Sequence, residues 1–152
     1  MIFLLNIIFS VIIDDRIDKI NQLTSSAENA FRNKDYKTSI ENYRQLIDSL
    51  DYNNEKVYLN LAHAHLLSND TLNAIENYNF ASLTDNQKVK SIALQQLGNI
   101  NEKKSKLEEA LSFYKQSIIS DNDNDDAKFN YELVKKKIQQ NQQKNNQEEN
   151  DK

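Results

Sequence analysis

Apolar residues recur along most of the chain at spacings of three and four, which places their side chains on one face of an α-helix. One such stripe comprises Tyr36, Ile40, Tyr43, Ile47 and Leu50. Similar stripes predict further helices over residues 17–31, 55–68, 72–83, 89–103 and 107–119. The pattern therefore predicts an all-α fold made of consecutive amphipathic helices.

A five-residue sequence recurs as SIENY at 39–43, AIENY at 74–78 and ALSFY at 110–114. The tyrosines that end these segments are 35 and 36 residues apart. A period of this length is typical of a helical hairpin repeated in tandem, because each hairpin can bury its apolar face only against its neighbours. We therefore expect a right-handed superhelical solenoid of three helical hairpins.

The composition supports this expectation and excludes several classes of function. The chain has one glycine and no proline, which disfavours tight strand hairpins and favours helices. Its formal charge is -4, and an acidic surface repels phosphate backbones, so we expect no nucleic-acid partner. It has no cysteine, which excludes disulfides and thiolate metal sites.

The first thirteen residues, MIFLLNIIFSVII, are apolar apart from Asn6 and Ser10. As a helix they would span about 20 Å, which is shorter than the roughly 30 Å hydrocarbon core of a bilayer. We therefore predict that residues 1–14 form a signal-like or anchor segment, with membrane association through residues 1–13. The alternative is an N-terminal helix buried in a cytoplasmic protein.

Each repeat carries a small residue in its first helix, at Ala27, Ala62 or Gly98. Together with the recurring tyrosines, these residues resemble the tetratricopeptide repeat, in which paired helices approach closely at small side chains. This chain lacks the proline that usually closes each repeat in that family. The resemblance implies a repeat region over residues 15–122, with repeats at about 20–54, 55–88 and 89–122.

Tetratricopeptide proteins bind partners on a concave surface lined by the first helix of each repeat, so the resemblance implies a set of contact residues. They are Glu28, Phe31 and Arg32 in the first repeat, Leu59, His63, Leu66 and Leu67 in the second, and Gln95, Asn99, Glu102 and Lys103 in the third. The three leucines would form an apolar patch, unless part of it packs against the N-terminal segment. Thr24 and Glu28 stand where chaperone-binding members need Lys and Asn, which argues against a chaperone-tail co-chaperone.

After the repeats, an amphipathic stripe with Ala127, Tyr131, Val134 and Ile138 predicts a capping helix over residues 123–140. Residues 141–152 are rich in Gln and Asn and have nothing apolar to bury, so we expect them to be disordered.

The order of these segments resembles the tetratricopeptide component (BatC/BatE-like) of bacterial Bat aerotolerance systems. An apolar N-terminal segment, repeats, a helix with the sequence AKFNYEL and a glutamine-rich tail follow one another in both. This resemblance implies a place at the cell envelope, with partners among membrane proteins that have von Willebrand factor A domains.

The acidic stretch DNDNDDAKFNYE at 121–132 has the ligand spacing of an EF-hand calcium loop. However, Asp126 stands where that loop needs glycine, and Lys128 stands where an apolar residue would pair with a second loop. We interpret the stretch as the turn that closes the third repeat, with Asp125 or Asp126 capping the next helix.

Other chemistry has little support in the sequence. The only two histidines, His63 and His65, point to different faces of a helix, and one glycine cannot form a phosphate-binding loop. We therefore expect no metal, no cofactor and no enzymatic activity. The sequence predicts a scaffold for protein–protein interaction at the bacterial cell envelope. A cytoplasmic chaperone-like or assembly factor that binds client peptides is the alternative.

Overall fold

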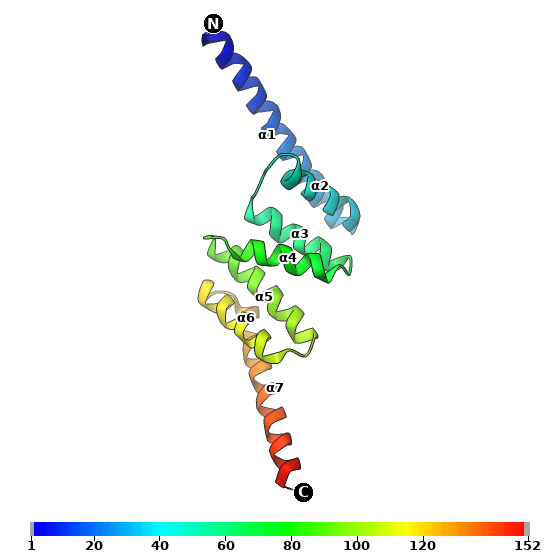
Figure 1. Cartoon of the computed structure of the whole chain (residues 1–152), viewed down its shortest axis with the longest axis vertical. Helices are drawn as coiled ribbons and strands as arrows, with labels where there is room; N and C mark the ends of the chain where they lie inside the picture. Colours follow the sequence, from blue (N-terminus) through cyan, green and yellow to red (C-terminus); the bar gives the residue numbers. More distant parts are fainter. Residues whose placement is uncertain (1, 151–152) are drawn as a thin grey trace. The chain divides into compact units, whose positions relative to one another are not determined.

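The computed structural model describes the backbone of residues 2–150 and the side chains of residues 15–147. Seven α-helices and no strand occupy this part of the chain, which confirms the all-α prediction. In chain order (Figure 1) they are α1 (Ile2–Arg32), α2 (Tyr36–Asp48), α3 (Glu55–Leu67), α4 (Thr71–Ser82), α5 (Gln87–Lys103), α6 (Leu107–Ser120) and α7 (Asp125–Asn150).

The helices belong to two compact units that divide between Asn77 and Tyr78, within α4. In the first unit, α1 packs against α2 and α2 packs against α3. In the second unit, α5 packs against α6 and α6 packs against α7. Within each unit, these consecutive helices are thus neighbours in space, as hairpin repeats require.

The core of the first unit is formed where the predicted apolar stripes of three helices meet. It comprises Leu23 and Ala27 of α1, Tyr43 and Leu46 of α2, and Val57 and Leu61 of α3. Ala27 and Leu46 are fully buried, and Tyr43 is 2% exposed. Because all six side chains belong to one cluster, the first hairpin and the helix that follows it are held by the same apolar contacts.

The second unit depends on a close approach between α5 and α6. Tyr114 of α6 is fully buried, and its ring lies directly over Gly98 of α5. A Cβ atom built on Gly98 would lie 2.5 Å from Cε1 of Tyr114 and 2.7 Å from Cδ1. Glycine is therefore required here by space rather than by backbone conformation, since Gly98 does not have a positive φ.

The turns inside the three hairpins have the same backbone geometry. Lys34, Asn69 and Ser105 occupy equivalent positions and have φ angles of 62°, 66° and 59°. After each of them, a backbone N–H donates to the carbonyl five residues earlier, for example from Asp70 to His65 at 2.9 Å. This is the Schellman arrangement that ends an α-helix, here formed without glycine.

The C-terminal segment differs from the prediction. We expected a capping helix over 123–140 and disorder over 141–152, whereas α7 continues to Asn150. Gln, Lys and Glu favour the helical state, and neither proline nor glycine interrupts this segment. Residues 139–147 are exposed, which agrees with their lack of apolar side chains. Residues 151–152 lie outside the described part of the chain.

The N-terminal segment joins the first repeat without a break, because α1 begins at Ile2. The side chains of residues 2–14 lie outside those described, so the signal or anchor function of this segment stays a prediction. Among the described residues, no helix has both the length and the apolar character needed to cross a membrane.

We predict that Gly98→Ala destabilises the protein, although alanine favours a helix by about 1 kcal/mol over glycine. The buried Tyr114 ring cannot move aside, because its hydroxyl is held at 2.8 Å by Asn99 and at 2.9 Å by Glu102. Overpacking of this kind costs about 1–3 kcal/mol or more, so we expect a net loss of about 2 kcal/mol in chemical denaturation. Adding Tyr114→Leu should relieve the overlap, and a neutral or stabilising Gly98→Ala would contradict the close packing.

A buried hydroxyl in the first repeat generates a second prediction. Ser39 is fully buried, and among the described residues its Oγ has no hydrogen-bond partner. Ala74 and Ala110 occupy the equivalent positions of the other repeats and are also fully buried. An unpaired buried hydroxyl is costly, so alanine suits this position better than serine.

We therefore expect Ser39→Ala to raise the free energy of unfolding by about 1 kcal/mol in urea denaturation. Ser91→Ala is the matched control, because the equally buried Ser91 hydroxyl donates to the Ser117 carbonyl at 2.9 Å. That variant should lower the stability. If both substitutions destabilise to the same extent, the Ser39 hydroxyl has a partner after all.

Candidate partner-binding site

A hollow of about 280 Å³ opens on the first unit, between three helices. α1 contributes Glu28, Phe31 and Arg32, α2 contributes Tyr43, and α3 contributes Asn60 and His63. Two contacts within the first repeat fix its walls. The Phe31 ring meets Tyr36 edge to face, with centroids 5.6 Å apart, and Arg32 donates to Asn29 Oδ1 at 2.7 Å.

The lining of the hollow is largely neutral and carries one charge of each sign. Burial lowers the pKa of His63, so its imidazole is neutral at pH 7. Burial raises the pKa of Tyr43 against an opposing hydrogen bond from Asn60, so its hydroxyl also stays neutral. Only Glu28 and Arg32 carry charge, one of each sign and one helical turn apart. The remaining lining is two aromatic rings, an amide and an imidazole.

The structure brings together four of the candidate contact residues that the sequence indicated, namely Glu28, Phe31, Arg32 and His63. Sequence reasoning missed Tyr43 and Asn60. Asn60 lies three residues before His63 and therefore on the same side of α3, which the helical spacing could have indicated. Tyr43 was assigned to the core alone, and it serves both the core and the hollow.

The three leucine candidates of α3 do not share one exposed surface. Leu59 is 7% exposed, Leu66 is half-buried and Leu67 is 51% exposed. An apolar patch formed by all three is therefore absent from the described surface of α3.

The candidates in the second unit lie beside α7. Asn99 Oδ1 accepts from Asn130 Nδ2 at 3.1 Å, and Glu102 Oε1 accepts from Lys137 Nζ at 2.6 Å. Gln95 Oε1 accepts from Asn124 Nδ2 at 3.0 Å. Lys103 is exposed. Three polar residues predicted to meet a partner thus bind the C-terminal segment of the same chain.

Glu102 is the electrostatic centre of this network. Partial burial opposes its ionisation, but hydrogen bonds from Lys137 and Tyr114 outweigh that effect and lower the pKa of its carboxyl. Burial and the same carboxylate raise the pKa of Tyr114. The pair is therefore a carboxylate and a neutral phenol at physiological pH. Hydrogen bonds from Tyr114 and Lys137 to the Glu102 carboxylate thus link α5, α6 and α7.

The acidic stretch before α7 forms the turn that connects α6 to α7. Asn124, not Asp125 or Asp126 as we expected, caps α7 by accepting from the Ala127 N–H at 3.0 Å. Its amide also donates to Ser91 Oγ at 3.0 Å, within a buried pair where Ser91 and Ser117 each donate to the carbonyl of the other. An amide can cap and donate at once, whereas a carboxylate only accepts, which explains why asparagine serves here.

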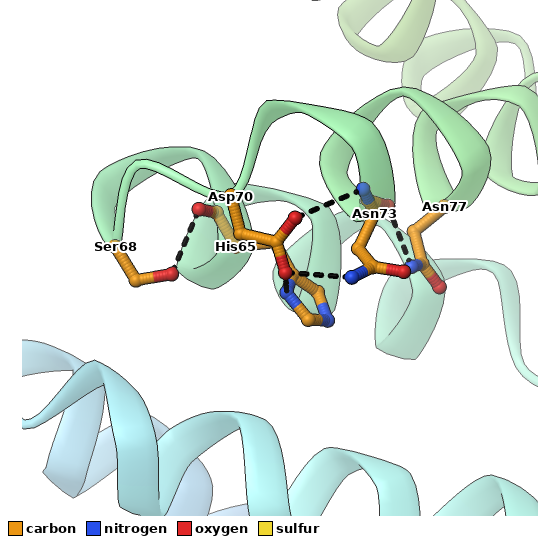
Figure 2. A network of polar contacts seen from close by, with 5 residues as sticks. All are labelled: His65, Ser68, Asp70, Asn73 and Asn77. Atoms are coloured by element: carbon orange, nitrogen blue, oxygen red, sulfur yellow. Dashed lines mark hydrogen bonds and ion pairs between the residues drawn. The ribbon is translucent and has the colours of Figure 1, made fainter.

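The second histidine has a structural role (Figure 2). His65 is 5% exposed, and its Nδ1 lies 3.0 Å from Asp70 Oδ2. Asp70 caps α4 by accepting from the Asn73 N–H at 3.2 Å, and hydrogen bonds from Asn73 are the main cause that lowers its pKa. The pair therefore fixes the turn of the second hairpin. Within the described residues, no three potential ligands gather to hold a metal ion.

Comparisons with known proteins agree with this architecture. No protein-family model matches the chain, and no curated protein matches it. Solved structures do match. The Sgt2 TPR domain from Aspergillus fumigatus is 25% identical over 82% of both chains, with a TM-score of 0.69.

Two further structures have the same fold. The first TPR of Spaghetti (RPAP3), bound to the HSP90 peptide SRMEEVD, is 21% identical over 80% of this chain and 94% of its own, with a TM-score of 0.69. The type III secretion chaperone SycD of Yersinia enterocolitica, in complex with a peptide of the translocator YopD, is 19% identical over 80% and 95%, with a TM-score of 0.71. The chain therefore has the tetratricopeptide-repeat fold.

We predict that Glu102→Gln lowers the free energy of unfolding by about 1 kcal/mol at pH 7, because it removes the ion pair with Lys137. Since the folded pKa of Glu102 is lowered, this stabilisation is fully present above the ordinary carboxyl pKa of 4.5 and is lost as the pH falls through the folded value. In urea denaturation, the difference in the free energy of unfolding between variant and wild type should be smaller at pH 3 than at pH 7. Glu109→Gln, in an exposed pair with Lys106 at 3.9 Å, should have almost no effect. An unchanged Glu102→Gln difference at pH 3 would contradict the ion pair.

Proposed function

We propose that this protein is a non-catalytic adaptor that binds an extended segment of a partner protein in the hollow of its first unit. The observation that carries the proposal is the convergence of Phe31, Tyr43, Asn60 and His63 on one hollow, with charges at Glu28 and Arg32. Aromatic rings offer apolar contact area, and the amide and imidazole offer hydrogen bonds to a peptide backbone.

Similar structures support peptide recognition, but the charges of this chain favour a peptide of different chemistry. RPAP3 holds the acidic peptide SRMEEVD, and SycD holds a peptide of YopD. In this chain Glu28 stands beside Arg32, so a strongly acidic tail would meet a like charge. We therefore assign the hollow to a partner segment with an apolar or aromatic side chain and little net charge.

For the cellular setting, we propose the cell envelope, with residues 1–13 as the export or anchor segment and a Bat-like role beside membrane proteins that have von Willebrand factor A domains. The order of segments in the sequence supports this. The second candidate is a cytoplasmic chaperone-like or assembly factor, which the likeness to SycD supports. The intact mass of the protein from its native host distinguishes the two, because a cleaved leader favours export and a full-length chain in the soluble fraction favours the second.

We predict that Arg32→Glu lowers recovery of the partner in affinity purification from a native membrane extract by about tenfold, since it leaves two like charges at the rim of the hollow. Arg44→Glu makes the same change at an exposed position of α2 outside the hollow and should leave recovery unchanged. Equal recovery with both variants would contradict the hollow as the binding site. If only cytosolic chaperones were recovered, the proposed role at the cell envelope would be wrong.

A further inference from the structure

One face of α7 is exposed and has a regular composition. Asp126, Phe129, Leu133 and Lys136 follow one another at spacings of three, four and three, so they share one side of the helix. All four are exposed, Phe129 at 69% and Leu133 at 38%. The other side of α7 carries fully buried Ala127 and Val134, and Val134 packs with Tyr114 of α6. The two apolar side chains of the exposed face are therefore not part of the core.

The two charged residues at the ends of this face, Asp126 and Lys136, differ from the other charged residues of α7 between 125 and 137 in forming no ion pair. Between residues 125 and 137, all of which are described, the ion pairs are Asp125 with Lys128, Glu132 with Lys135, and Lys137 with Glu102. Asp126 and Lys136 are the charged residues of this span that form no ion pair. They cannot pair with each other, because ten residues of helix separate them by about 15 Å.

The face is self-complementary under a two-fold axis. If a second copy of α7 runs antiparallel and the axis passes at Tyr131, residues equally distant from position 131 lie opposite each other. Phe129 then faces Leu133 of the second copy, and Asp126 faces Lys136 of the second copy. Each contact occurs twice. A parallel arrangement would instead place Asp126 against Asp126 and Lys136 against Lys136, which is repulsive.

We propose that this face of α7 is an interface between two copies of the chain, which associate through an antiparallel pair of α7 helices. The pair covers the exposed Phe129 and Leu133 and gives Asp126 and Lys136 the ion-pair partners that they lack within one chain. The interface does not use the hollow of the first unit, so it holds whether or not that hollow binds a peptide.

The test is sedimentation equilibrium of the full-length protein over a range of concentrations. The wild-type protein should show a molar mass that rises from monomer toward dimer. Asp126→Lys and Lys136→Asp should each weaken the association by about tenfold, because two-fold symmetry makes each substitution create two repulsive contacts in the dimer. Phe129→Ser should weaken it similarly, while Leu72→Ser, at 80% exposure on α4, should leave it unchanged. Circular dichroism confirms that each variant keeps its helix content.

Recombining the charges decides between this geometry and any other. An equimolar mixture of Asp126→Lys and Lys136→Asp should form mixed dimers, and the chain carrying both substitutions should regain self-association. A wild-type protein that stays monomeric at all concentrations overturns the proposal. So does an association that persists unchanged in the variants, as would be expected if the apolar N-terminal segment or another surface held the copies together.

Discussion

The constraint on which the structure depends is the close approach of paired helices at a small residue beside a buried tyrosine. In the first unit Ala27 and Tyr43 share one core, and in the second unit the Tyr114 ring leaves no room for a Cβ on Gly98. Both pairs are separated by sixteen residues. Because a tyrosine ring fills the space that the small residue leaves, hairpin geometry and core packing are set by the same two positions.

The tyrosines also connect the core to the polar surface. Tyr43 packs in the core of the first unit and lines the hollow beside Asn60, while Tyr114 reaches Asn99 and Glu102 with its hydroxyl. Tyrosine combines a large apolar contact area with a hydroxyl at the end of the ring that can form a hydrogen bond. Tyr43 therefore both holds helices together and lines the proposed binding surface, whereas Tyr114 connects the core of the second unit to the polar contacts with α7.

Helical periodicity and the repeated SIENY segment were sufficient to predict the helices, their pairing and the buried tyrosines, because those features follow from local spacing. The role of Gln95, Asn99 and Glu102 could not be predicted in the same way. A register assigns these residues to a surface, but their partners Asn124, Asn130 and Lys137 lie 29 to 35 residues later in the sequence. Nor does composition reveal that Asn124 caps α7 in place of the neighbouring acids, since that choice depends on the buried pair of Ser91 and Ser117. Four predicted contact residues on α1 and α3 line the hollow because they follow the helical repeat, whereas Tyr43 lies in both the core and the hollow, which one pattern cannot separate.

The unbroken course of α1 gives the first repeat a fixed angular relation to whatever precedes it. Glu28 and Arg32 lie on the same helix as Ile17 and, further back, Ile2. Each residue of an α-helix turns the chain by about 100°, so one residue inserted between these positions would swing the upstream segment by more than a quarter of a turn about the helix axis. The number of residues between the N-terminal segment and the hollow therefore sets both their distance along the helix and their relative orientation about its axis. A surface or partner that binds the first residues of α1 would therefore also set the direction in which Glu28 and Arg32 face.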